Sequence, residues 1–111
     1  MAPVAHGACL AAGPGAVASH RSAGALWRLD GLEPGRIEVT LPGRGERHLQ
    51  GVTIHRTRSL AVVEVCRRDG IPVTRPSRTL FDLASVLDRT RLEAAVAAAL
   101  RDGHAFRWRT S

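Results

Sequence analysis

The residues needed to cleave a phosphodiester bond are incomplete in this sequence. Restriction-like nucleases use carboxylates to hold Mg²⁺ and typically a lysine to position the nucleophile or to stabilise charge. The chain has no lysine, and the candidate carboxylates Asp82 and Glu93, two of its 10 Asp+Glu, fall within predicted helices. We interpret both as solvated or paired helix charges, and we predict that the protein is not an enzyme and has no catalytic residues.

Histidine and cysteine spacing predicts no metal centre. Cys9 and Cys66 form no CxxC pattern, and no two histidines stand three or four residues apart, the spacing that preforms a site on a helix. No segment approaches the ~20 apolar residues that cross a bilayer, and the N-terminus lacks a signal-peptide pattern. We therefore expect no metal, no cofactor, no membrane contact, and a soluble protein in the reducing cytoplasm.

Arginine supplies a different chemistry, the binding of anions. The sequence has 16 Lys+Arg, all of them arginine, against 10 Asp+Glu, which gives a formal net charge of +6. A surplus of this kind favours a polyanionic partner, of which nucleic acid is the first candidate. An alanine-rich chain without lysine is also typical of a GC-rich genome, so composition alone leaves a neutral explanation open.

The candidate anion-binding residues fall into local groups. An imidazole stands directly before a guanidinium at His20-Arg21 and at His55-Arg56, and such a pair can hold a phosphate group. In the structural alternative, Ser19 caps a helix and His20 is a partly buried spacer. The full set of candidate nucleic-acid or anion-binding residues is His20, Arg21, Arg44, Arg47, His55, Arg56, Arg58, Arg75 and Arg78.

Arg75 and Arg78, on either side of Pro76, have two interpretations. They can contact an anion together, or Arg78 can form an i, i+4 ion pair with Asp82 that ties its helix to a neighbouring strand. The spacing favours the ion pair. The remaining arginines of the central loop and strands are expected to form one basic surface that attracts the DNA backbone weakly, namely Arg44, Arg47, Arg56, Arg58, Arg67 and Arg68.

The first half of the chain is expected to supply two helices and a hairpin. A short helix ends at the glycine-rich turn over residues 13–15, and a second is predicted over residues 19–29. Period-two alternation then predicts a half-buried strand over residues 37–41 and another over residues 52–55. We expect the polar, glycine-rich loop over residues 42–51 to join them as a hairpin with a charged tip.

The second half begins with another hairpin signal. The Asp69-Gly70 pair predicts a tight turn between two short strands. Pro72 follows in the second strand and cannot donate a ladder hydrogen bond, so we expect that strand to lie at an edge or to be very short.

Two helices are predicted after this hairpin. Pro76 suits a first helical turn, and leucines recur after it at helical spacing. Thr90 and Glu93 match a capping box for the last helix, and Gly103 closes it. The order of elements predicts a small α+β fold, with helices packed on a mainly antiparallel sheet, and we expect the aromatic residues Trp27 and Phe81 in its core.

Three blocks of sequence resemble a known family. They are Ser19-His20-Arg21-Ser22-Ala23 leading to Ala25-Leu26-Trp27, then His55-Arg56-Thr57-Arg58, then the stretch from Gly70 to Ala84. In this order they resemble the AbiEi-like antitoxins of actinobacterial type, over residues 4–103. The resemblance implies an antitoxin or transcription regulator of a type IV, abortive-infection toxin–antitoxin system.

Longer members of this family carry an N-terminal winged helix-turn-helix, and some carry a very-short-patch-repair-like endonuclease domain. We expect residues 1–111 to be a single core domain without either, best supported over residues 19–103 and followed by a basic tail over residues 104–111. Its expected partners are the DNA backbone, bound weakly, and a cognate toxin or missing flanking domains. The alternatives are a fragment of an endonuclease-bearing protein, with the catalytic part absent from this chain, or a gene fragment without function.

Overall fold

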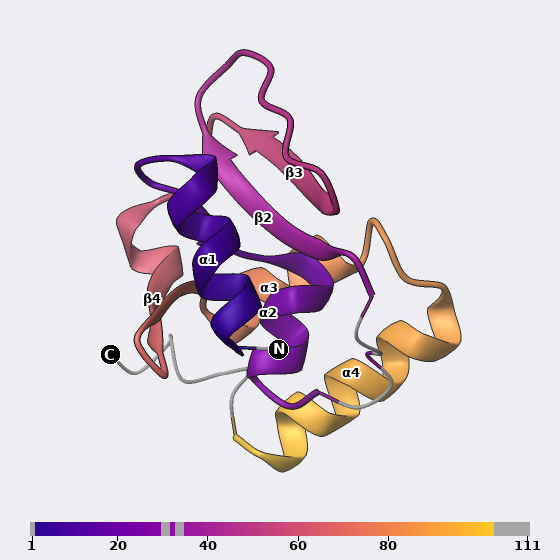
Figure 1. The fold of residues 1–111 in the computed structure, drawn as a ribbon. Coiled ribbons are helices and arrows are strands. Elements are labelled where there is room, and N and C mark those ends of the chain that lie inside the picture. The colour runs from indigo at the N-terminus through magenta and orange to yellow at the C-terminus, as the bar shows by residue number, and fades with distance from the viewer. Residues whose placement is uncertain (1, 30–31, 33–34, 104–111) are drawn as a thin grey trace.

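The computed structural model describes residues 2–29, 32 and 35–103 of the chain (Figure 1). These residues form a five-stranded sheet and its covering helices. The elements in chain order are α1 (Ala2–Ala12), β1 (Val17–Ala18), α2 (His20–Leu26), β2 (Ile37–Pro42), β3 (Val52–Thr57), the 3-10 helix η1 (Val62–Glu64), β4 (Val65–Arg68), β5 (Ile71–Thr74), α3 (Pro76–Leu83) and α4 (Arg89–Arg101).

The sheet is mixed, with strand order β3-β2-β1-β5-β4. The pairs β1–β2 and β4–β5 are antiparallel, whereas β1–β5 and β2–β3 are parallel. The predicted α+β class is therefore confirmed, but the expected predominance of antiparallel pairing is wrong. The central strand, β1, is only two residues long, so helices and side-chain bonds must help to hold the two halves of the sheet together.

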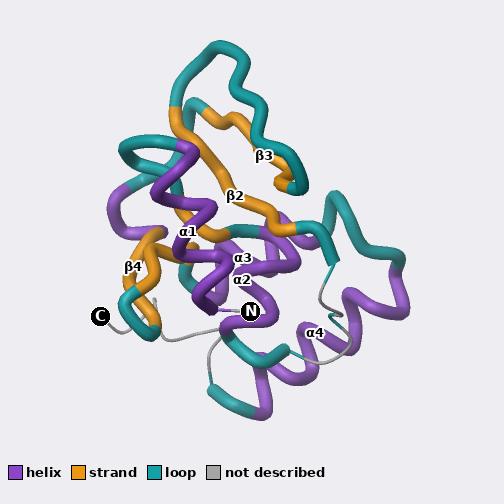
Figure 2. Tube along the Cα trace, in the orientation of Figure 1, coloured by secondary structure: helices purple, strands orange, loops and turns teal. Residues whose placement is uncertain are grey.

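The connection between β2 and β3 is the largest departure from the sequence prediction. Instead of a hairpin, the two strands run parallel in a register from Ile37 with Val52 to Pro42 with Thr57. The loop between them must return along the strands, and it turns at glycines with positive φ, including Gly43 (96°) and Gly45 (108°). Figure 2 shows this loop projecting beyond the sheet.

The β4–β5 hairpin confirms the Asp69-Gly70 turn. Both residues have positive φ, 53° and 77°, as a two-residue hairpin turn of type I′ requires. The strand with Pro72 is expected at an edge or to be very short. It does not lie at an edge, because β5 lies between β1 and β4, but it has only four residues. The β1–β5 ladder has one register pair, Ala18 with Val73, so a residue without an N–H is tolerated in β5.

The two faces of the sheet differ in chemistry. Val39 shares its register with Ala18 and Ile54, and this apolar face packs on α1 through Cys9 and Ala12. Figure 1 shows α1 on the near side of the sheet. A second apolar cluster joins Leu83 of α3 to the alanines of α4. The opposite face of β2 carries polar side chains and is covered by α2.

That polar face makes β2 more buried than the half-buried strand that the alternation predicts. Glu38 and Thr40 are as buried as Ile37, Val39 and Leu41. Polar side chains are tolerated at such positions only when they are hydrogen-bonded. Each of them is bonded to residues of the 19–22 segment.

Several helix limits differ from the predictions. α2 ends at Leu26 rather than Leu29, and the predicted Thr90 cap is wrong because Asp88 accepts a hydrogen bond from the Arg91 amide. Gly103 does close α4, with φ at 73°. Pro76 begins α3 as predicted. Among the described helices, none is both long and apolar enough to span a membrane.

Candidate functional site

The most distinctive site is a polar centre between β2, β3 and α2, formed by Ser19, His20, Glu38, Thr40 and His55. Thr40 and His55 are register partners on neighbouring strands, and Glu38 lies two residues before Thr40 on the same face. Ser19 and His20 meet this face from the start of α2. Four of the five residues are buried, and His55 is partly exposed.

Glu38 is the negative charge of the polar centre. Its carboxylate accepts the Arg21 backbone N–H at 2.8 Å and Arg21 Nη1 at 3.2 Å, and it lies 3.3 Å from His55 Nε2. Burial acts to raise the pKa of Glu38, but the hydrogen bond with His55 and the contacts with Arg21 outweigh burial and hold that pKa below its ordinary value. Glu38 therefore stays ionised inside the protein.

His20 stacks on His55 within the polar centre. The two rings lie 3.6 Å apart between centroids and are nearly parallel, and His20 Nδ1 is 2.9 Å from Ser19 Oγ. Burial, and next the proximity of His55, lower the pKa of His20 despite the opposing charges of Asp82 and Glu38. His20 also has a φ of 52°, an uncommon conformation for a non-glycine residue. The stack and the bond to Ser19 hold it there.

The polar centre contains a hydroxyl, imidazoles and a carboxylate, but these groups are hydrogen-bonded to one another inside the protein. Ser19 is fully buried, and its Oγ accepts a hydrogen bond from Thr40 at 2.7 Å. It is therefore not presented to a substrate. Ser19 occupies the N-cap position of α2 as expected, but its side chain makes no capping hydrogen bond to the helix.

Arg78 forms a second polar cluster with Glu64 and Asp82. Its Nε lies 3.0 Å from Asp82 Oδ1, its Nη1 lies 3.1 Å from Glu64, and Nη1 also donates to the Ser59 carbonyl. Burial acts to lower the pKa of Arg78, but the bonds to the two carboxylates raise it overall. The predicted i, i+4 pair is confirmed within α3. The bonds of Arg78 to Glu64 and to the Ser59 carbonyl, and not this pair, tie α3 to the segment before β4.

Asp82 connects this cluster to the polar centre. Its Oδ2 atom is buried and has no hydrogen-bond partner in the described part of the chain, while Oδ1 binds Arg78. The negative charge of Asp82 acts on His20. We refer to the polar centre and the Arg78 cluster together as the polar layer.

The structure divides the predicted anion-binding residues into internal and exposed groups. Arg21 is bonded to Glu38 and donates to the Val86 carbonyl at 2.7 Å, so it joins α2 to the chain after α3. Arg56 lies beneath the β2–β3 loop and donates to the Arg44 carbonyl. The exposed members are Arg44, Arg47, Arg58 and Arg75, and none forms an ion pair with a described carboxylate.

The single basic surface expected from sequence is divided between the two edges of the sheet. Arg56 lies on β3 at one edge, and Arg67 and Arg68 lie on β4 at the other. Arg68 also packs over the Trp27 ring at 4.5 Å and donates to the Leu26 carbonyl. Trp27 itself is partly buried against the core, as predicted in outline.

The structure contains an exposed apolar region that the sequence did not predict. Phe81, predicted in the core, is 74% exposed, and the neighbouring Val62 and Val63 are 86% and 75% exposed. A signal for Phe81 is present in the sequence, because it lies about 100° around the helix from the stripe that contains Leu80 and Leu83. The valines resemble a strand and give no such signal.

The fold and these sites define a small α+β domain with an internal polar layer and an arginine-rich surface. A family model described as AbiEi antitoxin C-terminal domain matches residues 11–105. Comparison with curated proteins gives no match. The chain belongs to the AbiEi antitoxin C-terminal domain family, which confirms the family resemblance, and an antitoxin domain implies a cognate toxin as its counterpart.

Proposed function

We propose that the chain is a non-enzymatic domain of a type IV toxin–antitoxin system, acting as an antitoxin or transcription regulator in the cytoplasm. It acts by protein contact and by weak attraction to the DNA backbone. The family supports the antitoxin role. The observation that carries the DNA part is a group of exposed arginines, without ion-pair partners among the described carboxylates, at one end of β2 and β3.

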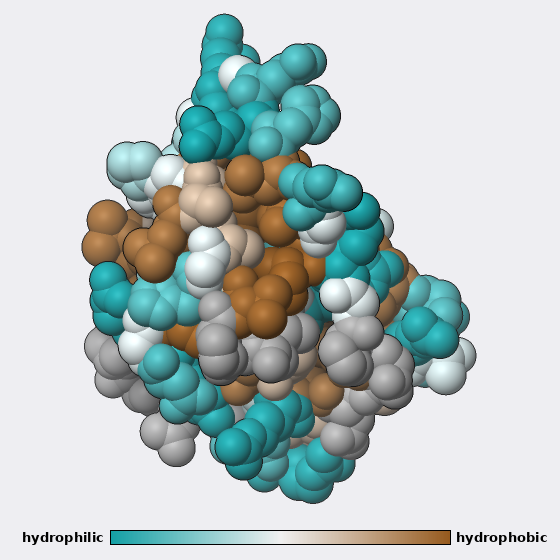
Figure 3. Space-filling view, in the orientation of Figure 1, coloured by the Kyte–Doolittle hydropathy of each residue, from teal (hydrophilic) through white to brown (hydrophobic). Residues whose placement is uncertain are grey.

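This basic end consists of Arg44, Arg47 and Arg58. The Gly43 N–H donates to the Thr57 carbonyl at 2.9 Å, which brings the segments of Arg44 and Arg58 together. Arg47 donates to the Ala11 carbonyl at the end of α1, and all three arginines are exposed. Figure 3 shows that the projecting loop is hydrophilic. Guanidinium groups on a projecting loop can reach phosphates without reading bases.

The small number of arginines explains why binding is weak. Glu46 lies in the same loop and offsets part of the charge. No described Phe, Trp or Tyr side chain lies at the basic end, so stacking on bases adds little there. The domain is therefore expected to bind duplex DNA with little sequence preference.

The test is a salt titration of duplex DNA binding, followed by fluorescence anisotropy. Three phosphate contacts predict a slope of log K against log salt of about −3. Replacing Arg44 and Arg58 by alanine should reduce the magnitude of that slope by about two. Arg89→Ala is the matched control, because Arg89 is exposed on α4, away from the projecting loop (Figure 1). No binding at low salt, or equal losses in both variants, would refute the DNA role.

A further inference from the structure

An apolar ridge crosses the surface between β3 and β4. We define it as Leu60–Val63, and its last two side chains, Val62 and Val63, are the most exposed large apolar groups in the described chain. Phe81 on α3 is exposed to a similar degree. Contiguous exposed apolar groups on a folded domain mark interaction sites more often than isolated ones do.

A groove runs along each side of the ridge. The groove on the α3 side has a volume of about 660 Å³ and is lined by Val63 and Phe81, among others. The groove on the sheet side has a volume of about 300 Å³ and is lined by Leu60 and Val62. Apolar side chains of a partner could therefore be received on both sides of one short segment.

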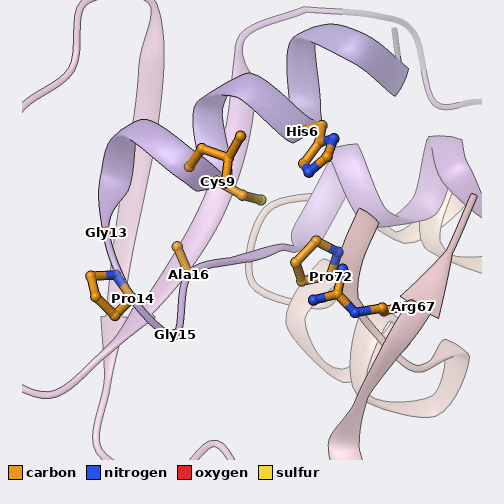
Figure 4. Close-up of a pocket in the computed structure, with 9 residues that line it drawn as sticks. His6, Cys9, Gly13, Pro14, Gly15, Ala16, Arg67 and Pro72 are labelled. Atoms are coloured by element: carbon orange, nitrogen blue, oxygen red, sulfur yellow. The ribbon is translucent and has the colours of Figure 1, made fainter. Parts of the chain in front are cut away.

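The sheet-side groove continues toward α1. Arg67 and Pro72 line both this groove and a neighbouring pocket of about 360 Å³. Figure 4 shows that pocket, with the Arg67 guanidinium beside Pro72 and with Cys9 of α1 across from them. The ridge and its grooves thus form one extended surface rather than an isolated patch.

Each groove contains an exposed positive charge. Arg75 lines the α3-side groove and Arg67 lines the sheet-side groove, and neither forms an ion pair with a described carboxylate. The nearby carboxylate of Glu64 is already engaged, since it accepts hydrogen bonds from Arg78 and from the Ala61 N–H. The charge that the surface presents to a partner is therefore positive.

We propose that the ridge docks a protein segment that carries both apolar side chains and carboxylates. The inference rests on the part of the proposed function in which the domain acts by protein contact, and it assigns that contact a surface and a chemistry. Apolar groups would cover Val62, Val63 and Phe81, while carboxylates would pair with Arg67 and Arg75.

Two other occupants fit less well. A nucleic acid backbone needs hydrogen-bond donors, but the centre of this surface is formed by valine side chains that offer none. A second copy of the chain in a two-fold dimer would place the same surface on both sides of the interface, so that two positively charged surfaces would meet. An acidic, apolar segment satisfies both features of the surface.

The experiment selects short random peptides displayed on phage against the immobilised 111-residue chain. Recovered peptides should be enriched in Asp and Glu together with Leu, Ile or Phe. A synthetic peptide of the enriched sequence should bind in fluorescence polarisation, and Val63→Ser or Arg75→Glu should each weaken that binding about tenfold or more, as expected for central interface residues. Because both positions are exposed, these variants should fold normally.

Two controls separate this surface from the rest of the molecule. Val4→Ser removes an exposed apolar side chain from α1 and should leave peptide affinity unchanged. Arg44→Glu should weaken DNA binding and leave peptide affinity unchanged. A failure of the DNA proposal and a failure of the docking proposal therefore give different results.

Other outcomes would overturn the docking proposal. These are the recovery of no enriched peptide, the recovery of basic peptides, or binding that survives both Val63→Ser and Arg75→Glu. Displacement of the peptide by duplex DNA in the Arg44→Glu variant would identify the ridge as a nucleic-acid site instead. Self-association lost on Val63→Ser would identify it as a contact between copies of the chain.

Discussion

Glu38→Ala should be among the most destabilising single changes in this domain. The carboxylate of Glu38 binds the Arg21 backbone and guanidinium and pairs with His55, and all three contacts disappear together. Removing one partner of a buried ion pair costs ~3–5 kcal/mol. Arg21 is 39% exposed and keeps its bond to the Val86 carbonyl, so water offsets part of the loss. We therefore expect the free energy of unfolding to fall by ~2–4 kcal/mol.

The assay is urea unfolding followed by far-ultraviolet circular dichroism, with the midpoint compared at constant m-value. Glu93→Ala is the matched control, because Glu93 pairs with Arg89 at 3.4 Å but both side chains are mostly exposed. That change should cost less than about 0.5 kcal/mol. Glu38→Gln keeps the shape and one acceptor oxygen, so it should fall between the two.

Equal, small losses of stability in Glu38→Ala and Glu93→Ala would refute this expectation. That result would mean that the contacts of Glu38 do not outweigh the cost of burying its charge. It would also contradict the ionised state of Glu38, because the lowered pKa of Glu38 and the stabilisation have the same source.

Two further predictions concern the same polar layer. The free energy of unfolding should fall as the pH drops through about 6.5, because folding lowers the pKa of His20 and the unfolded chain then binds a proton that the folded protein does not. Below about pH 4.3 it should fall further, because folding also lowers the pKa of Glu38. Each proton gives a slope of at most ~1.4 kcal/mol per pH unit, and a His20→Asn variant that keeps the slope near pH 6 would disprove the assignment. Arg78→Ala should cost ~3 kcal/mol in urea unfolding, because it leaves Glu64 and the buried Asp82 without their cation. Arg89→Ala should cost little, and an equal loss in both would contradict the role of Arg78.

Local signals in the sequence predict the features that a few neighbouring residues control. Asp69 and Gly70 adopt positive φ with little strain, so the tight turn of the β4–β5 hairpin could be predicted. Pro76 and Gly103 mark the start of α3 and the end of α4 for the same kind of reason. The Arg78–Asp82 pair was predictable because residues four apart on a helix lie on one side.

The candidate sites depend more on contacts between distant segments. The sequence predicts that Arg21 binds an anion because a histidine stands directly before it. In the structure, the partners of Arg21 are Glu38, 17 residues away in sequence, and the Val86 carbonyl, 65 residues away. His20 and His55 each stand out separately, and nothing in the sequence predicts that their rings stack. In the sequence, the valines of the ridge have the pattern of a strand. Their exposure becomes clear only from the structure.

The sequence by itself determined the family, the α+β class, the tight turn, the start of α3 and the arginine-rich charge. These follow from residue identity and from backbone preferences that act over a few positions. The tertiary structure decided the parallel pairing of β2 with β3, the burial of Glu38 and the exposure of Phe81. The reason is that strand pairing and burial depend on which segments pack against each other. The free energy of that packing is not determined by either segment alone.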